Sequence, residues 1–134
     1  MFLQPKRSKY KKSRKGTLPK LEFRSNKLRF GTIGLKALES GTITARQIEA
    51  ARQSISRKIK RKGKLWVRIF PSLPITAKPT EVRMGKGKGA VSHWACKVGG
   101  GAILFELCGV TKNTAILAFK TGGAKLPIKT SIFE

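Results

Sequence analysis

The chain has 134 residues and carries thirty Lys and Arg against six Glu and no Asp, which gives a formal net charge of +24. A compact domain with this imbalance repels itself unless a dense polyanion neutralises it, and nucleic acid is the polyanion that such a charge most often indicates. The composition argues against an enzyme, because six scattered Glu and one His do not readily form a carboxylate pair or a triad, and no apolar run approaches the roughly 18–20 residues of a membrane span.

Residues 1–27 are interpreted as a basic N-terminal extension, and residues 28–134 as a single α+β domain. The extension holds ten Lys and Arg, one Glu and two Pro. It cannot bury enough apolar surface to offset its chain entropy, so we expect it to become ordered only on a partner. Tyr10 and Phe23 suit either stacking on nucleobases or packing on the domain. The cations of the extension assigned to RNA contact are Lys6, Arg7, Lys9, Lys11, Lys12, Arg14 and Lys15.

The domain is predicted to open with a strand over residues 25–38, interrupted by two glycines, before its first helix. That helix begins at Thr44, which forms a capping box with Gln47, and Gly63 is a natural stop. One helical face is apolar and the other almost wholly cationic, with only Glu49 available for an ion pair. Such a face suits a helix that lies on phosphates, and a merely solvated face is the alternative. The cations placed on it are Arg46, Arg52, Arg57, Lys58 and Arg61.

The rest of the domain is predicted to be mainly strands. A strand over residues 65–70 is followed by a short one over residues 81–84, and residues 91–98 and 102–107 are expected to pair as a hairpin across Gly99-Gly100-Gly101. A second helix is expected from Thr111, weakened in its last turn by Gly122-Gly123, and then a final strand over residues 128–133. This order predicts an α+β fold, a two-layer sandwich of a mostly antiparallel sheet with two helices.

The most specific motif is a glycine–lysine loop at residues 83–89. Glycine removes side chains and permits positive φ, so the backbone can approach a bulky surface. The loop is not a Walker A motif, because that motif needs Ser or Thr directly after its lysine and Lys88 is followed by Gly89. It is not a dinucleotide-binding fingerprint either, because residue 90, where the third glycine would be, is Ala. A phosphate contact is therefore the better interpretation, and a flexible surface hairpin is the alternative. The loop consists of Arg83, Met84, Gly85, Lys86, Gly87, Lys88 and Gly89.

The sequence indicates no cofactor and no metal site. His93 is the single histidine, and Cys96 and Cys108 are the two cysteines, whereas metal ligation needs more such residues at fixed spacing. The ordinary interpretation is two buried thiols and a strand histidine in a reducing compartment.

Segments along almost the whole chain carry a family resemblance. They are residues 3–7, 30–31, 34–37, 44–52, 63–71, 74–76, 78–79, 82–89, 104–106, 109–110 and 124–130. In their order these segments resemble the family of large ribosomal subunit protein sixteen, of bacterial and organellar type.

The resemblance implies an α+β sandwich bound to large-subunit rRNA near the tRNA A site, with roles in subunit assembly and tRNA positioning during translation. It implies that the loop at residues 83–89 reaches toward the tRNA-binding face, that the extension threads along rRNA, and that neighbouring large-subunit proteins are partners. In some bacterial members the arginine that matches Arg83 is hydroxylated. The resemblance implies no cofactor, no membrane and no homo-oligomer. The alternative from another class is a free nucleic-acid-binding regulator or RNA chaperone.

Four features depart from bacterial members of that family: the Gly99-Gly100-Gly101 run, the Gly122-Gly123 pair in place of an Ala-rich helical stretch, the two cysteines, and the Lys-rich, rather sparse N-terminal extension. We interpret this drift as typical of an organellar ribosome and favour the mitochondrion over the plastid, with the bacterial cytoplasm as the alternative. Because the family pattern begins at Leu3 with no presequence ahead of it, the gene is expected to be organelle-encoded.

Overall fold

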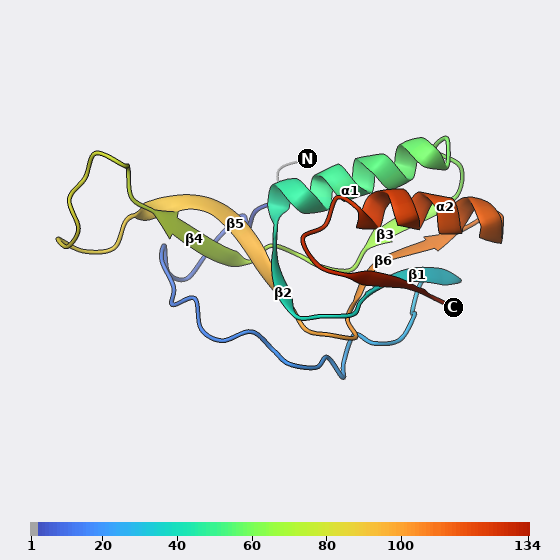
Figure 1. Ribbon diagram of the computed structural model, residues 1–134, viewed down its shortest axis with the longest axis horizontal. Coiled ribbons are helices and arrows are strands. Elements are labelled where there is room, and N and C mark those ends of the chain that lie inside the picture. Colours follow the sequence, from blue (N-terminus) through green and yellow to red (C-terminus); the bar gives the residue numbers. More distant parts are fainter. Residues whose placement is uncertain (1–2) are drawn as a thin grey trace.

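Seven strands and two helices make up the computed structural model, which describes residues 3–134 (Figure 1). The first two residues of the predicted extension lie outside the described residues. In chain order the elements are β1 (Ile33–Ala37), β2 (Gly41–Thr44), α1 (Ala45–Lys58), β3 (Lys64–Val67), β4 (Leu73–Ala77), β5 (Ala90–Val98), β6 (Ile103–Cys108), α2 (Lys112–Gly123) and β7 (Thr130–Phe133).

The strands form two antiparallel sheets, one with the order β3-β6-β1-β7 and one with the order β2-β5-β4. The helices α1 and α2 pack on each other and form a layer over the strands (Figure 1). Leu35, Ile55, Phe105 and Phe119 are fully buried in the core that the two layers enclose. The predicted α+β sandwich with two helices is confirmed, with its strands divided between two sheets.

Helix α1 begins where its capping residues predict. The Thr44 side chain accepts a hydrogen bond from the Gln47 N–H at 3.3 Å, and the Gln47 side chain accepts one from the Thr44 N–H at 2.9 Å. The helix ends at Lys58, before the predicted stop at Gly63. It ends early because Lys60 and Arg61 have φ values of 53° and 59°, in the left-handed region that terminates a right-handed helix.

Helix α2 continues through Gly122 and Gly123, so the expected weak last turn is nonetheless helical. The reason lies in the packing of the two helices. A Cβ atom on Gly122 would lie 2.5 Å from Cγ1 of Ile55 and 3.5 Å from the carbonyl oxygen of Ala51, both on α1. Glycine at this position therefore lets α1 and α2 approach more closely than any side chain would permit.

The predicted hairpin across Gly99-Gly100-Gly101 is wrong, because β5 and β6 belong to different sheets and the glycines carry the chain from one to the other. Gly101 has φ of 94°, which favours glycine. The backbone of the extension docks on the same turn: the Glu22 N–H donates to the Gly100 carbonyl at 2.9 Å, and the Gly100 N–H donates to the Lys20 carbonyl at 3.2 Å. The glycines thus leave room for a segment far away in sequence.

The predicted strand over residues 81–84 is also wrong. These residues are exposed and lie in a turn, where the Val82 N–H donates to the Pro79 carbonyl at 3.2 Å. A strand lies earlier, as β4, between the two predicted strands, and it contains Pro74. Since β4 is an edge strand that pairs only with β5, it tolerates a proline that an inner strand would not. The short strand β2 was likewise missed.

The predicted opening strand is much shorter in the structure, because residues 29–31 bind a buried carboxylate instead of a neighbouring strand. Glu106 on β6 is fully buried and accepts hydrogen bonds from the N–H groups of Phe30 and Gly31, each at 2.7 Å. It also accepts from the Arg29 N–H and pairs with the guanidinium of Arg68. Burial raises the pKa of Glu106, but the backbone donors and the Arg68 guanidinium outweigh it, and the pKa is lowered overall.

Candidate nucleic-acid interface

Almost none of the positive charge is neutralised within the chain. Only three of the thirty Lys and Arg side chains form an ion pair among residues 3–134, namely Arg52 with Glu49, Arg68 with Glu106 and Lys112 with Glu134. Two further carboxylates are hydrogen-bonded to backbone N–H groups: Glu22 to those of residues 24 and 25, and Glu39 to that of residue 129. The surface therefore presents a strong, unbalanced positive field to solvent.

The cations predicted on α1 do not all share one face. Arg46, Arg57, Lys58 and Arg61 are exposed as expected. Arg52 is half-buried, and its guanidinium donates two hydrogen bonds to Glu49, at 2.7 and 2.9 Å. These hydrogen bonds from Arg52 are the main cause that lowers the pKa of Glu49 to about 2. Arg52 is thus the one cation predicted on this face that has an ion-pair partner among residues 3–134, and its contact with RNA stays a prediction.

Two hollows lie along the exposed part of α1. The first, here called the arginine hollow, has a volume of about 320 Å³ and is lined by Arg52, Gln53, Ser56, Arg57 and Arg61. The second, here called the lysine groove, has a volume of about 750 Å³ and reaches across to α2; it is lined by Ala50, Gln53, Ser54, Arg57, Lys58, Lys60, Thr121 and Lys125. The structure therefore brings Arg52, Arg57 and Arg61 together and separates Lys58 from Arg52.

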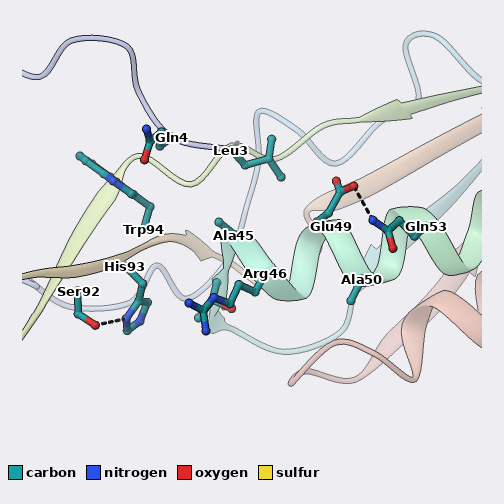
Figure 2. A pocket seen from close by; sticks show the side chains of 11 residues that line it. Leu3, Gln4, Ala45, Arg46, Glu49, Ala50, Gln53, Ser92, His93 and Trp94 are labelled. Atoms are coloured by element: carbon teal, nitrogen blue, oxygen red, sulfur yellow. Dashed lines mark hydrogen bonds between the residues drawn. The ribbon is translucent and has the colours of Figure 1, made fainter. Parts of the chain in front are cut away.

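Arg46 lies apart from both hollows, at the N-terminal end of α1. It lines a groove of about 740 Å³ between α1, β5 and the start of the extension (Figure 2). His93 and Trp94 of β5 also line this groove. Leu3 of the extension lines it as well and packs against the hydrophobic core. Oγ of Ser92 lies 3.4 Å from Nδ1 of His93. No carboxylate among residues 3–134 is hydrogen-bonded to this imidazole. The groove is therefore lined by one cation, Arg46, and by the rings of His93 and Trp94, and these residues form no catalytic triad among residues 3–134.

The glycine–lysine loop protrudes at the far end of the β4–β5 ribbon (Figure 1). Gly85, Lys86 and Gly87 have φ of 93°, 52° and 92°, so three successive residues are in the left-handed region. Two of the three are glycines, which adopt this conformation without a steric penalty. Residues 83–88 are exposed, and Met84 is 98% exposed. Gly89 differs, since a Cβ atom there would overlap the Ala77 carbonyl at the end of β4. The loop thus places its cations and a bare Met side chain in solvent, away from the core.

The extension lies against this loop. The Lys12 ammonium donates to the Lys88 carbonyl at 2.7 Å, and the Lys88 ammonium donates to the Ser13 carbonyl. The Lys97 ammonium of β5 donates to the Thr17 carbonyl at 3.1 Å. Two regions that were predicted separately as RNA contacts therefore lie side by side.

Residues 3–27 contain no helix or strand, only an isolated bridge from Leu21 to Gly100. The seven cations predicted to contact RNA are exposed, as are Tyr10 and Phe23 at 68% and 77%. Neither aromatic ring is packed into the domain, which leaves stacking on nucleobases as the interpretation to test.

We expect residues 6–18 to be disordered in the free protein and residues 20–25 to be ordered. The first stretch is held only by exposed lysine contacts, whereas the second makes backbone hydrogen bonds to Gly100 and from Ile103. In an NMR spectrum of the RNA-free chain, amide signals of residues 6–18 should be poorly dispersed with low order parameters, and Glu22 and Gly100 should be protected from hydrogen exchange. Dispersed, protected amides throughout residues 6–18 would contradict this expectation.

The remaining polar groups do not assemble into a second kind of site. Across residues 3–134, no three His, Cys, Asp or Glu side chains are grouped so that they could hold a metal ion. Cys96 is buried, and burial raises the pKa of its thiol to about 11, while Cys108 is half-buried. Neither α1 nor α2 is long and apolar enough to cross a bilayer.

Sequence reasoning missed part of the cationic surface. Lys60 and Lys125 line the lysine groove together with Thr121, but they are 65 residues apart in the sequence and lie outside any predicted basic face. A signal was present for Lys60, which follows directly on the cations of α1. No local pattern marks Lys125, because its position depends on how α2 packs on α1.

Comparison with known proteins gives two matches. The family model described as Ribosomal protein L16p/L10e matches residues 5–133 of the chain. Over 133 residues the chain is 54% identical to the large ribosomal subunit protein uL16 of Chelativorans sp. (strain BNC1), in an alignment that covers 99% of this chain and 97% of that protein. That relative is bacterial, so the preference for a mitochondrial ribosome finds no support.

Proposed function

Because the chain belongs to the ribosomal protein L16p/L10e family, we propose that it binds large-subunit rRNA near the tRNA A site and supports subunit assembly and tRNA positioning. Its membership makes it a structural, non-enzymatic component of the large ribosomal subunit in translation. The observation that carries the proposal is the unbalanced charge, since thirty cations have only three carboxylate partners within the described chain.

The cations divide into two groups with different proposed partners. The exposed cations of α1 and of the extension bind rRNA phosphates, which fix the orientation of the protein on the RNA. The glycine–lysine loop reaches beyond the body of the domain on the β4–β5 ribbon, and it meets RNA at the tRNA-binding face. Neighbouring large-subunit proteins are the further partners of the chain.

The relative from Chelativorans also bears on the compartment. We assign the chain to the cytoplasmic ribosome of a bacterium, because a bacterial protein matches it over nearly its full length.

Sedimentation distinguishes a ribosomal component from a free RNA-binding regulator. The protein should remain with large subunits through a high-salt sucrose cushion, whereas a free regulator would stay at the top of the gradient.

Replacing Arg83, Lys86 and Lys88 together by Ala should impair the ribosome while leaving the fold intact. The three side chains are exposed and contribute no packing, and exposed substitutions usually change stability by no more than about 0.5 kcal/mol each. Melting of the free protein should therefore be nearly unchanged, while subunit maturation or tRNA accommodation should be slowed in ribosomes that carry the variant.

The matched control replaces Lys112, Lys120 and Lys129 by Ala, which removes the same charge from exposed positions outside the loop. A large fall in melting temperature of the loop variant would make the loop structural. Normal assembly and translation, equal to those of the control, would make it dispensable. Either result contradicts the proposed role.

A further inference from the structure

The lysine groove has the composition of a phosphate-binding site. Four cations line it: Arg57 and Lys58 in the last turn of α1, Lys60 just after α1, and Lys125 just after α2. No carboxylate lines it. Hydroxyl groups of Ser54 and Thr121 and the amide of Gln53 add hydrogen-bonding groups of the kind that contact phosphate oxygens.

The lysine groove and the arginine hollow lie on opposite flanks of α1. Ser54 lines the first and Ser56 the second, and residues two positions apart on an α-helix are rotated by about 200° from each other. Gln53 and Arg57 line both hollows and so form the crest between them.

The turn that follows α1 distributes two neighbouring cations between these flanks. Lys60 lines the lysine groove and Arg61 lines the arginine hollow. Both residues have positive φ, a conformation that costs free energy for a residue with a side chain. Strained backbone of this kind is found preferentially at functional sites, where the geometry that it imposes is used.

We propose that the lysine groove is a second phosphate site and that α1 lies between two phosphate-bearing strands of duplex RNA. A helix with its side chains is about 10–12 Å across, so phosphates bound on its two flanks are too far apart to be neighbours on one strand. A single strand would occupy one flank and leave the cations of the other unneutralised. Two strands that border a groove of an RNA helix neutralise both. This inference rests on the proposed binding to rRNA and specifies its geometry.

The test uses the full-length chain and two probes, an RNA duplex of about 16 base pairs and a single strand of the same length. The variant Lys60→Ala/Lys125→Ala removes two cations from the lysine groove alone. Its control, Lys120→Ala/Lys129→Ala, removes two exposed cations that lie outside both hollows and have no ion-pair partner among residues 3–134. Affinity is measured over a range of salt concentrations for each protein and each probe.

On the duplex, the groove variant should reduce the slope of log affinity against log salt by about 1.8, at about 0.9 per phosphate lost, and the control should reduce it much less. On the single strand the reduction should be less than half as large, because a lone strand can bind to the arginine hollow instead. Equal slopes for the groove variant and the control on the duplex would overturn the second phosphate site. Equal reductions on both probes would overturn the two-strand geometry.

A second variant separates binding from folding. Lys60→Gly removes the side chain but suits the positive φ, so its melting temperature should be equal to or above that of the wild type while its duplex affinity falls. Unchanged duplex affinity in a folded Lys60→Gly variant would count against the groove. A wild-type chain whose affinity for either RNA is independent of salt would contradict the rRNA-binding proposal itself, which is a different result from a failure of the groove variant alone.

Discussion

Replacing Glu106 by Gln should destabilise the protein by about 3–5 kcal/mol, a large part of the 5–15 kcal/mol that holds a typical domain together. The carboxylate is fully buried, binds the guanidinium of Arg68 and accepts hydrogen bonds from residues 29–31. An amide keeps the shape but leaves the Arg68 charge uncompensated, and its NH₂ group cannot accept from a backbone N–H. Urea denaturation of the free protein at neutral pH measures the loss.

The control is Glu81→Gln, the same chemical change at an exposed position, which should alter the free energy of unfolding by no more than about 0.5 kcal/mol. An equally small change in Glu106→Gln would show that the buried pair does not hold residues 29–31 in place.

The same variant predicts a change in the dependence of stability on pH. The pKa of Glu106 is lowered in the folded protein. The ionised carboxylate therefore contributes fully to the free energy of unfolding above pH 4.5, the ordinary pKa of Glu, and this contribution is lost as the pH falls below that value. Wild-type protein should therefore lose stability in acid more steeply than Glu106→Gln. Glu49, with a pKa of about 2, titrates in both proteins and does not affect the comparison.

Raising the salt concentration from 50 to 200 mM should weaken binding to large-subunit rRNA by about 10³–10⁵-fold, if the chain neutralises about 6–10 phosphates. Replacing Arg46, Arg57 or Arg61 singly by Ala should lower the slope of log affinity against log salt by about 0.7–0.9 each, because these exposed cations have no ion-pair partner among residues 3–134. Arg52→Ala should lower it less, since Glu49 already neutralises that guanidinium.

Lys112→Ala is the control for this series, because Lys112 is exposed, lies outside α1 and already pairs with Glu134. A filter-binding or anisotropy titration at several salt concentrations gives each slope. A slope near zero, or one that none of the arginine substitutions changes, would refute the electrostatic account of RNA binding.

The sequence predicted those features that depend on neighbouring residues. The start of α1 follows from Thr44 and Gln47, and the left-handed loop follows from glycines at alternate positions. Features that depend on distant residues were missed or misinterpreted. The Gly99-Gly100-Gly101 run was predicted to be a hairpin turn, because no local pattern shows that the extension docks on it. Residues 29–31 were predicted to be part of a strand, because the carboxylate that binds Gly31 belongs to Glu106, which is 75 residues away in the sequence.

The candidate site follows the same division. The charge of Arg57, Lys58 and Arg61 and the exposure of the loop could be predicted, because solvated cations need no particular partner. The ion pair that occupies Arg52 and the approach of Lys125 to α1 depend on side-chain and helix packing that no local pattern encodes.

The missing side chain at Gly122 links the interior of this protein to its affinity for RNA. With no atom beyond Cα at that point, Ile55 of α1 packs directly against the backbone of α2, close in sequence to Thr121 and Lys125, which line the lysine groove opposite Lys58 and Lys60. A methyl group added at residue 122 would widen the lysine groove from within. In a variant that still melts cooperatively, weaker RNA binding would therefore report a change in spacing between cations, caused at a buried residue.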